Sequence, residues 1–274
     1  MTTFVAWVGV DSRGPSSINF ASDSRISWGP VGLQHWDMAR KTFSSSTSPD
    51  IFGYVNDVVF PSMVLGQLIN AIDVGGLFAG NPSSSKRFEI AVEHIKNSYE
   101  NYAKDYKESF CIFHGSREGN VSASKFSLNT IAWDKTKSIW IVEQIIIPDT
   151  SMAIIINGSG GSVVKKWSDR WASSSQKGTS RAIFSSFCNA ISSGEDKRSG
   201  GAPQLVSLYR IDSGKTIGFV GDSKKFISGI EIINLTNISD GNKIEWRNSF
   251  FERCDETGNR LVKAKEHHIP KGLG

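Results

Sequence analysis

The stretch TTFVAWVGVDSRGPSSINFASDSRIS, residues 2–27, decides the fold. Residues 3–10 mix β-branched and aromatic side chains, the turn-prone segment DSRGPSS follows, and residues 17–27 form a second extended run. Two such runs joined by a turn are typical of a β-hairpin. The sequence therefore predicts a hairpin at the start of the domain.

Strands and helices follow this hairpin in an order that defines the fold class. Segments that alternate apolar and polar residues predict strands, and segments with apolar residues three or four apart predict helices. The order β, α, β, α, β predicts an α+β domain, and two antiparallel sheets with helices outside them would give a four-layer αββα sandwich, although other α+β arrangements fit the pattern equally. The expected strands are residues 42–43, 51–54, 126–133, 139–147, 205–211 and 215–221, and the expected helices are residues 58–72, 86–110, 163–172 and 179–191.

No internal repeat and no long linker divides the chain. We therefore predict one domain over residues 1–224 and treat residues 225–274 as a C-terminal extension of unknown role, because the pattern becomes irregular after about residue 225.

The composition narrows the class of protein. Hydrophobic residues make up 39% and charged residues 21%, which is typical of a globular domain. The net charge is +4, but the basic residues are spread among 27 acidic ones, so we expect no nucleic-acid partner. No segment reaches the roughly 18 apolar residues of a membrane span, and the N-terminus lacks the pattern of a signal peptide. Three distant cysteines without a CxxC motif fit a reducing cytoplasm and predict neither a zinc site nor a disulfide framework.

Thr2 carries the chemistry if Met1 is removed. An N-terminal threonine has a hydroxyl nucleophile and a primary amine in one residue, so the amine can act as the base. An α-amino group has a pKa of about 7.7 to 8.0, which leaves part of it neutral at physiological pH without help from a histidine. By itself, a threonine here is more often an ordinary strand residue, so other residues must support this hypothesis.

Two charged residues give that support. Lys41 lies in MARKTF at the start of an expected strand, where an ammonium group would lower the pKa of the Thr2 hydroxyl. Asp23, near the end of the second strand, would hold this ammonium by a charge-assisted hydrogen bond.

Together these residues resemble the proteasome β subunits, and above all the HslV-type peptidases that work beneath an unfoldase ring. The segments MTTFVAWVGV and FASDSRIS are similar to the family's N-terminal threonine pair and aspartate-bearing second strand, with a longer hairpin turn here. This resemblance implies that Thr2 is the nucleophile and that Asp23 is the partner of Lys41. The segment IFGYVND implies Gly53, twelve residues after Lys41, as the glycine of the oxyanion hole.

Two later segments extend the resemblance over most of residues 2–220. INGSGGSVVKKW is similar to the family's GSGG segment and implies that Ser159 hydrogen-bonds near the nucleophile's amine. DKRSGGAPQLVSLYRI is similar to the proteasomal D-x-x-S-G-G loop and implies that Asp196 and Ser199 orient that amine. The family implies a four-layer αββα fold of the N-terminal-nucleophile (Ntn) hydrolases.

The chain also departs from the family. Tyr54, Val55, Asn56 and Asp57 stand where the family usually has small residues, a change expected to reshape the specificity pocket or crowd the oxyanion hole. The tail, with adjacent histidines at 267 and 268, has no counterpart that we recognise. Adjacent histidines suggest a metal site but are more often simply exposed.

The resemblance predicts a cytoplasmic threonine-type peptidase that acts on protein or peptide substrates and needs no metal or organic cofactor. It also implies a homo-oligomeric ring served by a separate ATPase unfoldase, since the glycine cluster NGSGGS lacks the GK[ST] ending of a phosphate-binding loop and the chain contains no complete GxxxxGK[ST] motif. Two alternatives stay open: an Ntn amidohydrolase acting on a small molecule or a side-chain amide, and a catalytically silent ring subunit.

Overall fold

The N-terminal hairpin forms as predicted and lies inside a larger sheet. The computed structural model describes residues 2–29, 34–233 and 244–264. Two antiparallel strands, β1 (Thr3–Asp11) and β2 (Gly14–Ser22), make the hairpin. We call the sheet that contains it sheet I; its strand order is β10-β1-β2-β11-β12-β13-β14. The remaining strands of this run are β10 (Met152–Gly158), β11 (Gln204–Tyr209), β12 (Lys215–Gly221), β13 (Lys224–Ile227) and β14 (Ile230–Glu231).

A second antiparallel sheet, sheet II, has the strand order β5-β6-β7-β8-β9. The two predicted strand pairs, at 42–54 and 126–147, both lie in this sheet. A strand between them, β7, joins them into one sheet. Its strands are β5 (Thr42–Ser44), β6 (Asp50–Asn56), β7 (Phe110–Glu118), β8 (Lys125–Asp134) and β9 (Ile139–Ile145).

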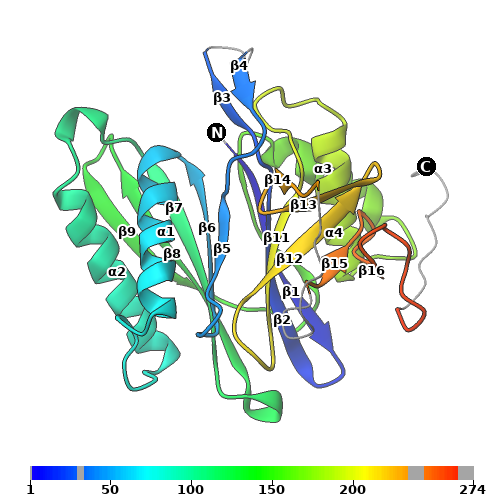
Figure 1. Cartoon of the computed structure of the whole chain (residues 1–274), viewed down its shortest axis with the longest axis horizontal. Helices are drawn as coiled ribbons and strands as arrows, with labels where there is room; N and C mark the ends of the chain where they lie inside the picture. The colour runs from blue at the N-terminus through cyan, green and yellow to red at the C-terminus, as the bar shows by residue number, and fades with distance from the viewer. Residues whose placement is uncertain (1, 30–33, 234–243, 265–274) are drawn as a thin grey trace.

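Helices cover the outer face of each sheet. The apolar sides of α1 (Val59–Asp73) and α2 (Ser84–Glu100) pack on sheet II, and those of α3 (Gly161–Ala172) and α4 (Ser180–Ser192) pack on sheet I. The predicted α+β class and four-layer αββα sandwich are therefore confirmed (Figure 1). Among the described residues, no helix is both long and apolar enough to cross a membrane.

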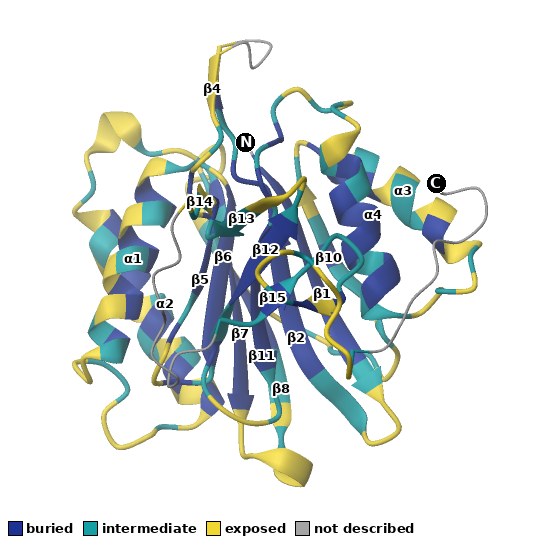
Figure 2. Cartoon of the chain, turned by 45° about the vertical axis from the view of Figure 1, so that its right-hand side comes forward, coloured by how far each residue is buried: buried dark blue, intermediate teal, exposed yellow. Residues whose placement is uncertain are grey.

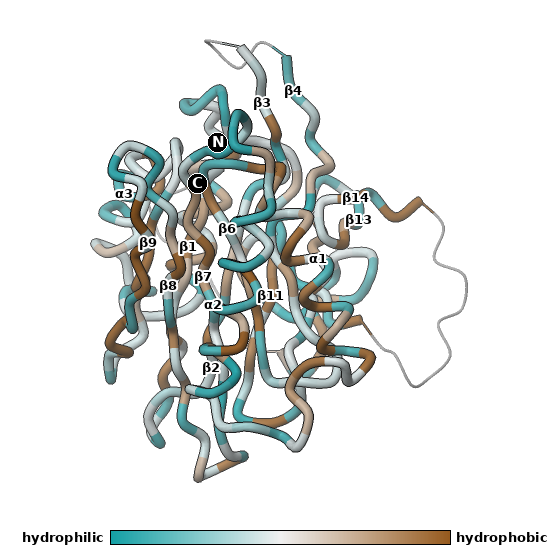
Figure 3. Tube along the Cα trace, turned by 90° about the vertical axis from the view of Figure 1, so that its left-hand side faces the viewer, coloured by the Kyte–Doolittle hydropathy of each residue, from teal (hydrophilic) through white to brown (hydrophobic). Residues whose placement is uncertain are grey.

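Aromatic side chains fill the space between the sheets. The ring of Phe4 stacks on Phe113 with centroids 4.4 Å apart, so that β1 of sheet I contacts β7 of sheet II, and it meets the edge of Phe20 in β2 at 5.3 Å. Buried residues concentrate along the two sheets, whereas the helices expose their outer faces (Figure 2). Hydrophobic segments follow the strands, and hydrophilic segments predominate in the loops at the ends of the sandwich (Figure 3).

One predicted helix is too long, and two strands of the structure were not predicted. The helix expected over residues 86–110 ends at Glu100, and a short 3-10 helix, η1 (Lys104–Tyr106), leads into β7. We did not predict β7 or β10. Since β7 lies between two other strands and is buried on both faces, its apolar run lacks the alternation that marks a half-exposed strand.

The extended run predicted at 17–27 is also interrupted. Strand β2 ends at Ser22, and the chain then leaves sheet I to form a two-stranded ribbon from β3 (Ile26–Trp28) and β4 (Gln34–Trp36). This ribbon projects from one end of the sandwich (Figure 1). Trp28 and Trp36 are about half exposed on it.

Part of the predicted C-terminal extension continues sheet I. Strand β13 pairs with β12 in antiparallel fashion, and β15 (Trp246–Arg247) pairs with β12 in parallel. Strand β16 (Arg253–Cys254) then pairs with β15. The boundary after residue 224 stays a prediction, but residues on both sides of it share one sheet.

We expect Phe113→Ala to destabilise the fold strongly, because the ring is 2% exposed and its loss leaves a cavity between the two sheets. Truncation of a buried phenylalanine costs about 3–5 kcal/mol of unfolding free energy. Urea denaturation of the variant and the wild type measures this difference. Tyr106→Ala, which removes a ring that is 71% exposed, is the control. Equal stability losses in the two variants would contradict the proposed inter-sheet core.

Candidate active site

A buried ion pair joins the ends of the two sheets. Asp23 directly follows β2 of sheet I, and Lys41 directly precedes β5 of sheet II. Both side chains are fully buried, and Lys41 Nζ lies 2.9 Å from Asp23 Oδ1. The ammonium also donates to the carbonyl oxygen of Arg25 at 2.5 Å. Burial lowers the pKa of Lys41 below its ordinary value, while the negative charge of Asp23 acts in the opposite direction.

The Asp23 carboxylate is held by backbone amides on both of its oxygens. Oδ1 accepts from Thr3 N at 2.8 Å as well as from the lysine. Oδ2 accepts from Arg25 N and from Gly200 N, each at 3.1 Å. Such charge-assisted hydrogen bonds offset the cost of burying the carboxylate.

A second cluster contains the two predicted serines and Asp196. Ser159 lies in the turn between β10 and α3, and the other two residues lie in the loop between α4 and β11. Asp196 Oδ2 accepts from Ser199 Oγ at 2.7 Å and from Ser159 Oγ at 2.8 Å. Burial alone would raise the pKa of Asp196, but these two hydrogen bonds, together with the backbone amide and the positive charge of Arg198, outweigh it, and the pKa lies below its ordinary value.

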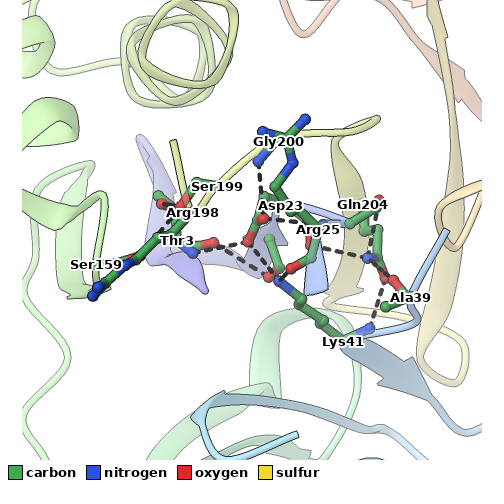
Figure 4. A network of polar contacts seen from close by, with 12 residues as sticks. Thr3, Asp23, Arg25, Ala39, Lys41, Ser159, Arg198, Ser199, Gly200 and Gln204 are labelled. Carbon is green, nitrogen blue, oxygen red and sulfur yellow. Dashed lines mark hydrogen bonds and ion pairs between the residues drawn. The ribbon is translucent and has the colours of Figure 1, made fainter. Parts of the chain in front are cut away.

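Thr3 connects the two clusters. Its backbone nitrogen donates to Asp23, and its hydroxyl oxygen lies 2.6 Å from Ser199 Oγ. Figure 4 shows Thr3 between the serine cluster on one side and the ion pair on the other. Two polar clusters from distant parts of the sequence therefore meet at Thr3, the first residue of β1.

Thr2 immediately precedes this connecting residue. It is fully buried, and its Oγ1 has no hydrogen-bond partner within the described part of the chain. A buried hydroxyl without a partner is uncommon and needs an explanation. Met1, whose removal the hypothesis requires, lies outside the described residues.

Two glycines of the NGSGG segment allow β1 to approach this turn. Gly158 has a φ of +92°, and a β-carbon there would collide with the Thr2 carbonyl oxygen. A β-carbon at Gly160 would collide with the Thr3 hydroxyl. Both positions therefore require glycine for close contact with the N-terminal threonines.

Gly53, predicted as the oxyanion-hole donor, lies within β6. It faces Thr42, the residue after Lys41, across the ladder with β5. A β-carbon at Gly53 would collide with the Phe4 ring, so packing between the sheets is sufficient to explain this glycine. Its role as a donor stays a prediction.

Tyr54 and Val55, the two residues directly after Gly53, lie in the hydrophobic core. Tyr54 is fully buried against the helices on sheet II, and its hydroxyl donates to the Arg40 carbonyl at 3.2 Å. Val55 is buried between the sheets. Asp57 accepts from Phe60 N in the first turn of α1 at 3.2 Å.

The sequence motifs did not indicate Gln204, whose side chain binds the backbone of both members of the ion pair. Its side chain is buried at the start of β11, accepts from Lys41 N at 2.9 Å and donates to the Asp23 carbonyl at 3.1 Å. A polar residue opening the otherwise apolar strand QLVSLY was the available signal. The analysis also missed Arg25, whose guanidinium binds both carboxylate oxygens of Asp37 at 2.7 and 2.8 Å.

The structure does not address the histidine pair considered as a metal site, because residues 267 and 268 lie outside the described ranges. Within residues 2–29, 34–233 and 244–264, no group of three or more His, Cys, Asp or Glu side chains is arranged to hold a metal ion.

Comparisons with known proteins support the fold. No family model and no curated protein matches the sequence. The structure is similar to the helical assembly of the Anbu complex from Pseudomonas aeruginosa, with a TM-score of 0.53 and 15% identity over 78% of this chain and 86% of that chain. It also aligns with eukaryotic HslV from Trypanosoma brucei, with a TM-score of 0.45 and 12% identity over 76% of this chain and 99% of that chain. The similarity to the Anbu complex shows that this chain has the four-layer αββα fold of the proteasome-like, Ntn-hydrolase type.

We expect Lys41→Met to be strongly destabilising, because it leaves Asp23 charged and buried without its cation. Removing one partner of a buried ion pair costs about 3–5 kcal/mol. Urea denaturation measures the change. Lys86→Met is the control, since that lysine forms an exposed pair with Glu89 and its loss should barely alter stability. A Lys41→Met protein as stable as this control would show that the buried pair does not hold the two sheets together.

Asp196 should contribute stability that acid removes. Its pKa is lowered in the folded chain, so the unfolded chain takes up the proton first as the pH falls below the ordinary value of 3.8. Wild-type stability then falls as the pH drops through the folded pKa, whereas Asp196→Asn lacks this loss. We therefore expect the Tm advantage of the wild type over Asp196→Asn to shrink between about pH 5 and pH 2. A Tm difference that stays constant over this range would contradict the serine-carboxylate cluster.

Proposed function

We propose that this chain is an N-terminal-threonine peptidase whose nucleophile is Thr2 after removal of Met1. One observation carries the proposal: the Thr2 hydroxyl is buried without a partner beside a residue held by both polar clusters. A structural threonine at a strand start has no need for a buried lysine and a serine-carboxylate cluster beside it. Ionisable groups with perturbed pKa values that cluster beside a buried hydroxyl are typical of an active site.

In the proposed reaction, the Thr2 oxygen attacks the carbonyl carbon of a peptide bond, and its proton passes to the Thr2 amine. The carbon–nitrogen bond then breaks, the leaving amine takes up that proton, and an ester with Thr2 remains. Water attacks this ester, releases the carboxylic acid and restores the hydroxyl. The backbone amide of Gly53 is the proposed donor to the oxyanion.

The other residues prepare the nucleophile. Lys41 supplies positive charge close to the start of β1, and Asp23 fixes its position. Since Asp23 Oδ1 contacts both Lys41 Nζ and Thr3 N, a single carboxylate oxygen links the ammonium to the residue after Thr2. We assign Ser159, Asp196 and Ser199 the task of orienting the freed amine.

We also propose that the chain works in the cytoplasm as a homo-oligomer, with a separate ATPase unfoldase that delivers protein substrates. The Anbu complex, whose fold this chain shares, forms a helical assembly, which supports self-association of some kind. A ring and the unfoldase rest on the resemblance of the sequence motifs to HslV-type peptidases.

Thr2→Ala should abolish turnover without unfolding the protein, and Thr2→Ser should retain part of it, because serine keeps both the hydroxyl and the amine. We expect a loss of kcat of about 10³-fold or more for Thr2→Ala. Fluorogenic peptide amides measure turnover, and intact mass verifies that one methionine residue has been lost from each protein.

Unchanged turnover in Thr2→Ala would end the proposal. Thr3→Val is the matched control for the neighbouring hydroxyl, since it should weaken activity without removing the nucleophile. Hydrolysis of small acyl amides but not of peptides would retain the nucleophile and replace the proposed substrate.

A further inference from the structure

Gln204 occupies an unusual place beside the Lys41–Asp23 pair. Its side-chain amide is 1% exposed and engaged at both ends. Oε1 accepts from Lys41 N at 2.9 Å. Nε2 donates to the Ala39 carbonyl at 2.6 Å and the Asp23 carbonyl at 3.1 Å, and it lies 3.2 Å from Ser24 Oγ. One side chain therefore binds the backbone on both sides of the ion pair.

No strand ladder sets the distance between the two charges. Asp23 follows a strand of sheet I, and Lys41 precedes a strand of sheet II. The segments meet through a backbone hydrogen bond from Ala39 N to Ser24 O at 3.0 Å and through Gln204. Because Gln204 belongs to β11, which pairs with β2 along sheet I, it attaches the lysine-bearing segment of sheet II to sheet I.

We propose that Gln204 is a positioning residue for the reaction proposed above, an inference that rests on that function. It acts through Lys41 and Asp23: by fixing their backbones, it fixes where the ammonium lies relative to Thr2. The role requires a donor and an acceptor at the end of the same side chain. Glutamate lacks the donor when ionised, and methionine lacks both.

The chain provides a matched control in the same sheet. Asn19 in β2 is another fully buried amide, and its hydrogen bonds to Ser17 at 3.0 Å and Ser207 at 2.7 Å lie within sheet I. Asn19→Asp and Gln204→Glu make the same chemical change, amide to acid, in comparable burial. Only the second touches the ion pair.

The test compares kcat and KM for the wild type, Gln204→Glu and Asn19→Asp on a fluorogenic peptide amide between about pH 5.5 and 8.5, with Thr2→Ala as the blank. The new carboxyl would face the carbonyl oxygens of Ala39 and Asp23, so it donates a hydrogen bond only when protonated. The charged groups facing this position are Asp23 and Lys41, with Arg25 and Asp37 beyond them.

We expect Gln204→Glu to lose about tenfold or more in kcat at pH 8 while KM stays within about twofold, and its kcat relative to the wild type to fall as the pH rises. For Asn19→Asp the relative kcat should not change with pH. Should Gln204→Glu fail to fold, Gln204→Met takes its place with Asn19→Leu as its control, and a kcat loss confined to the Gln204 variant supports the proposal.

Wild-type kcat in a Gln204 variant, or the same pH behaviour as in the Asn19 control, would overturn the role of Gln204 while leaving the active wild type and inactive Thr2→Ala in place. Absence of turnover in processed wild type, together with no covalent labelling by a peptide β-lactone, would overturn the proposed function and this inference with it.

Discussion

The buried contact between Lys41 and Asp23 constrains the rest of the structure. Each charge comes from a different sheet, so the sandwich brings them together only when both sheets are folded and stacked. A buried ion pair is stable only when its remaining hydrogen-bonding capacity is used. The amides of Thr3 and Gly200 and the carbonyl of Arg25 meet that demand, and each of these groups fixes a further loop around the start of β1.

The sequence pattern was sufficient to predict the α+β class, but it left the arrangement of the layers open, and the resemblance to the proteasome family implied the four-layer sandwich. The four helices and the strand pair at 126–147 show a clear periodicity of apolar residues, whereas β-branched and aromatic residues beside turn segments indicated the hairpin and the strand pair at 42–54. Strand β7 escaped prediction because it is buried on both faces. The same absence of periodicity made the preceding helix seem longer than it is.

The candidate site was predicted in part. Short motifs indicated Asp23, Lys41, Ser159, Asp196 and Ser199, and the structure brings them together in the two groups expected. No local pattern indicates the contacts that join those groups, because Gln204 lies 163 residues from Lys41 and Ser199 lies 196 residues from Thr3. Contacts over such separations depend on the packing of whole sheets. At Gly53 the structure supplies a packing reason, because a β-carbon there would collide with the Phe4 ring. The family motif associates the same glycine with the oxyanion hole.

The ribbon of β3 and β4 is inserted between the two charged residues of the pair. The guanidinium of Arg25 binds the carboxylate of Asp37 and so joins the two ends of the ribbon. Gln204 binds the carbonyl of Ala39, which follows the ribbon in the chain. Ser27 of the ribbon also contacts the loop of the serine cluster, since its hydroxyl lies 3.5 Å from the Arg198 carbonyl oxygen. The half-exposed rings of Trp28 and Trp36 can change without removing any hydrogen bond of the ion pair, so these ribbon positions can acquire a new recognition role while the contacts beneath them stay the same.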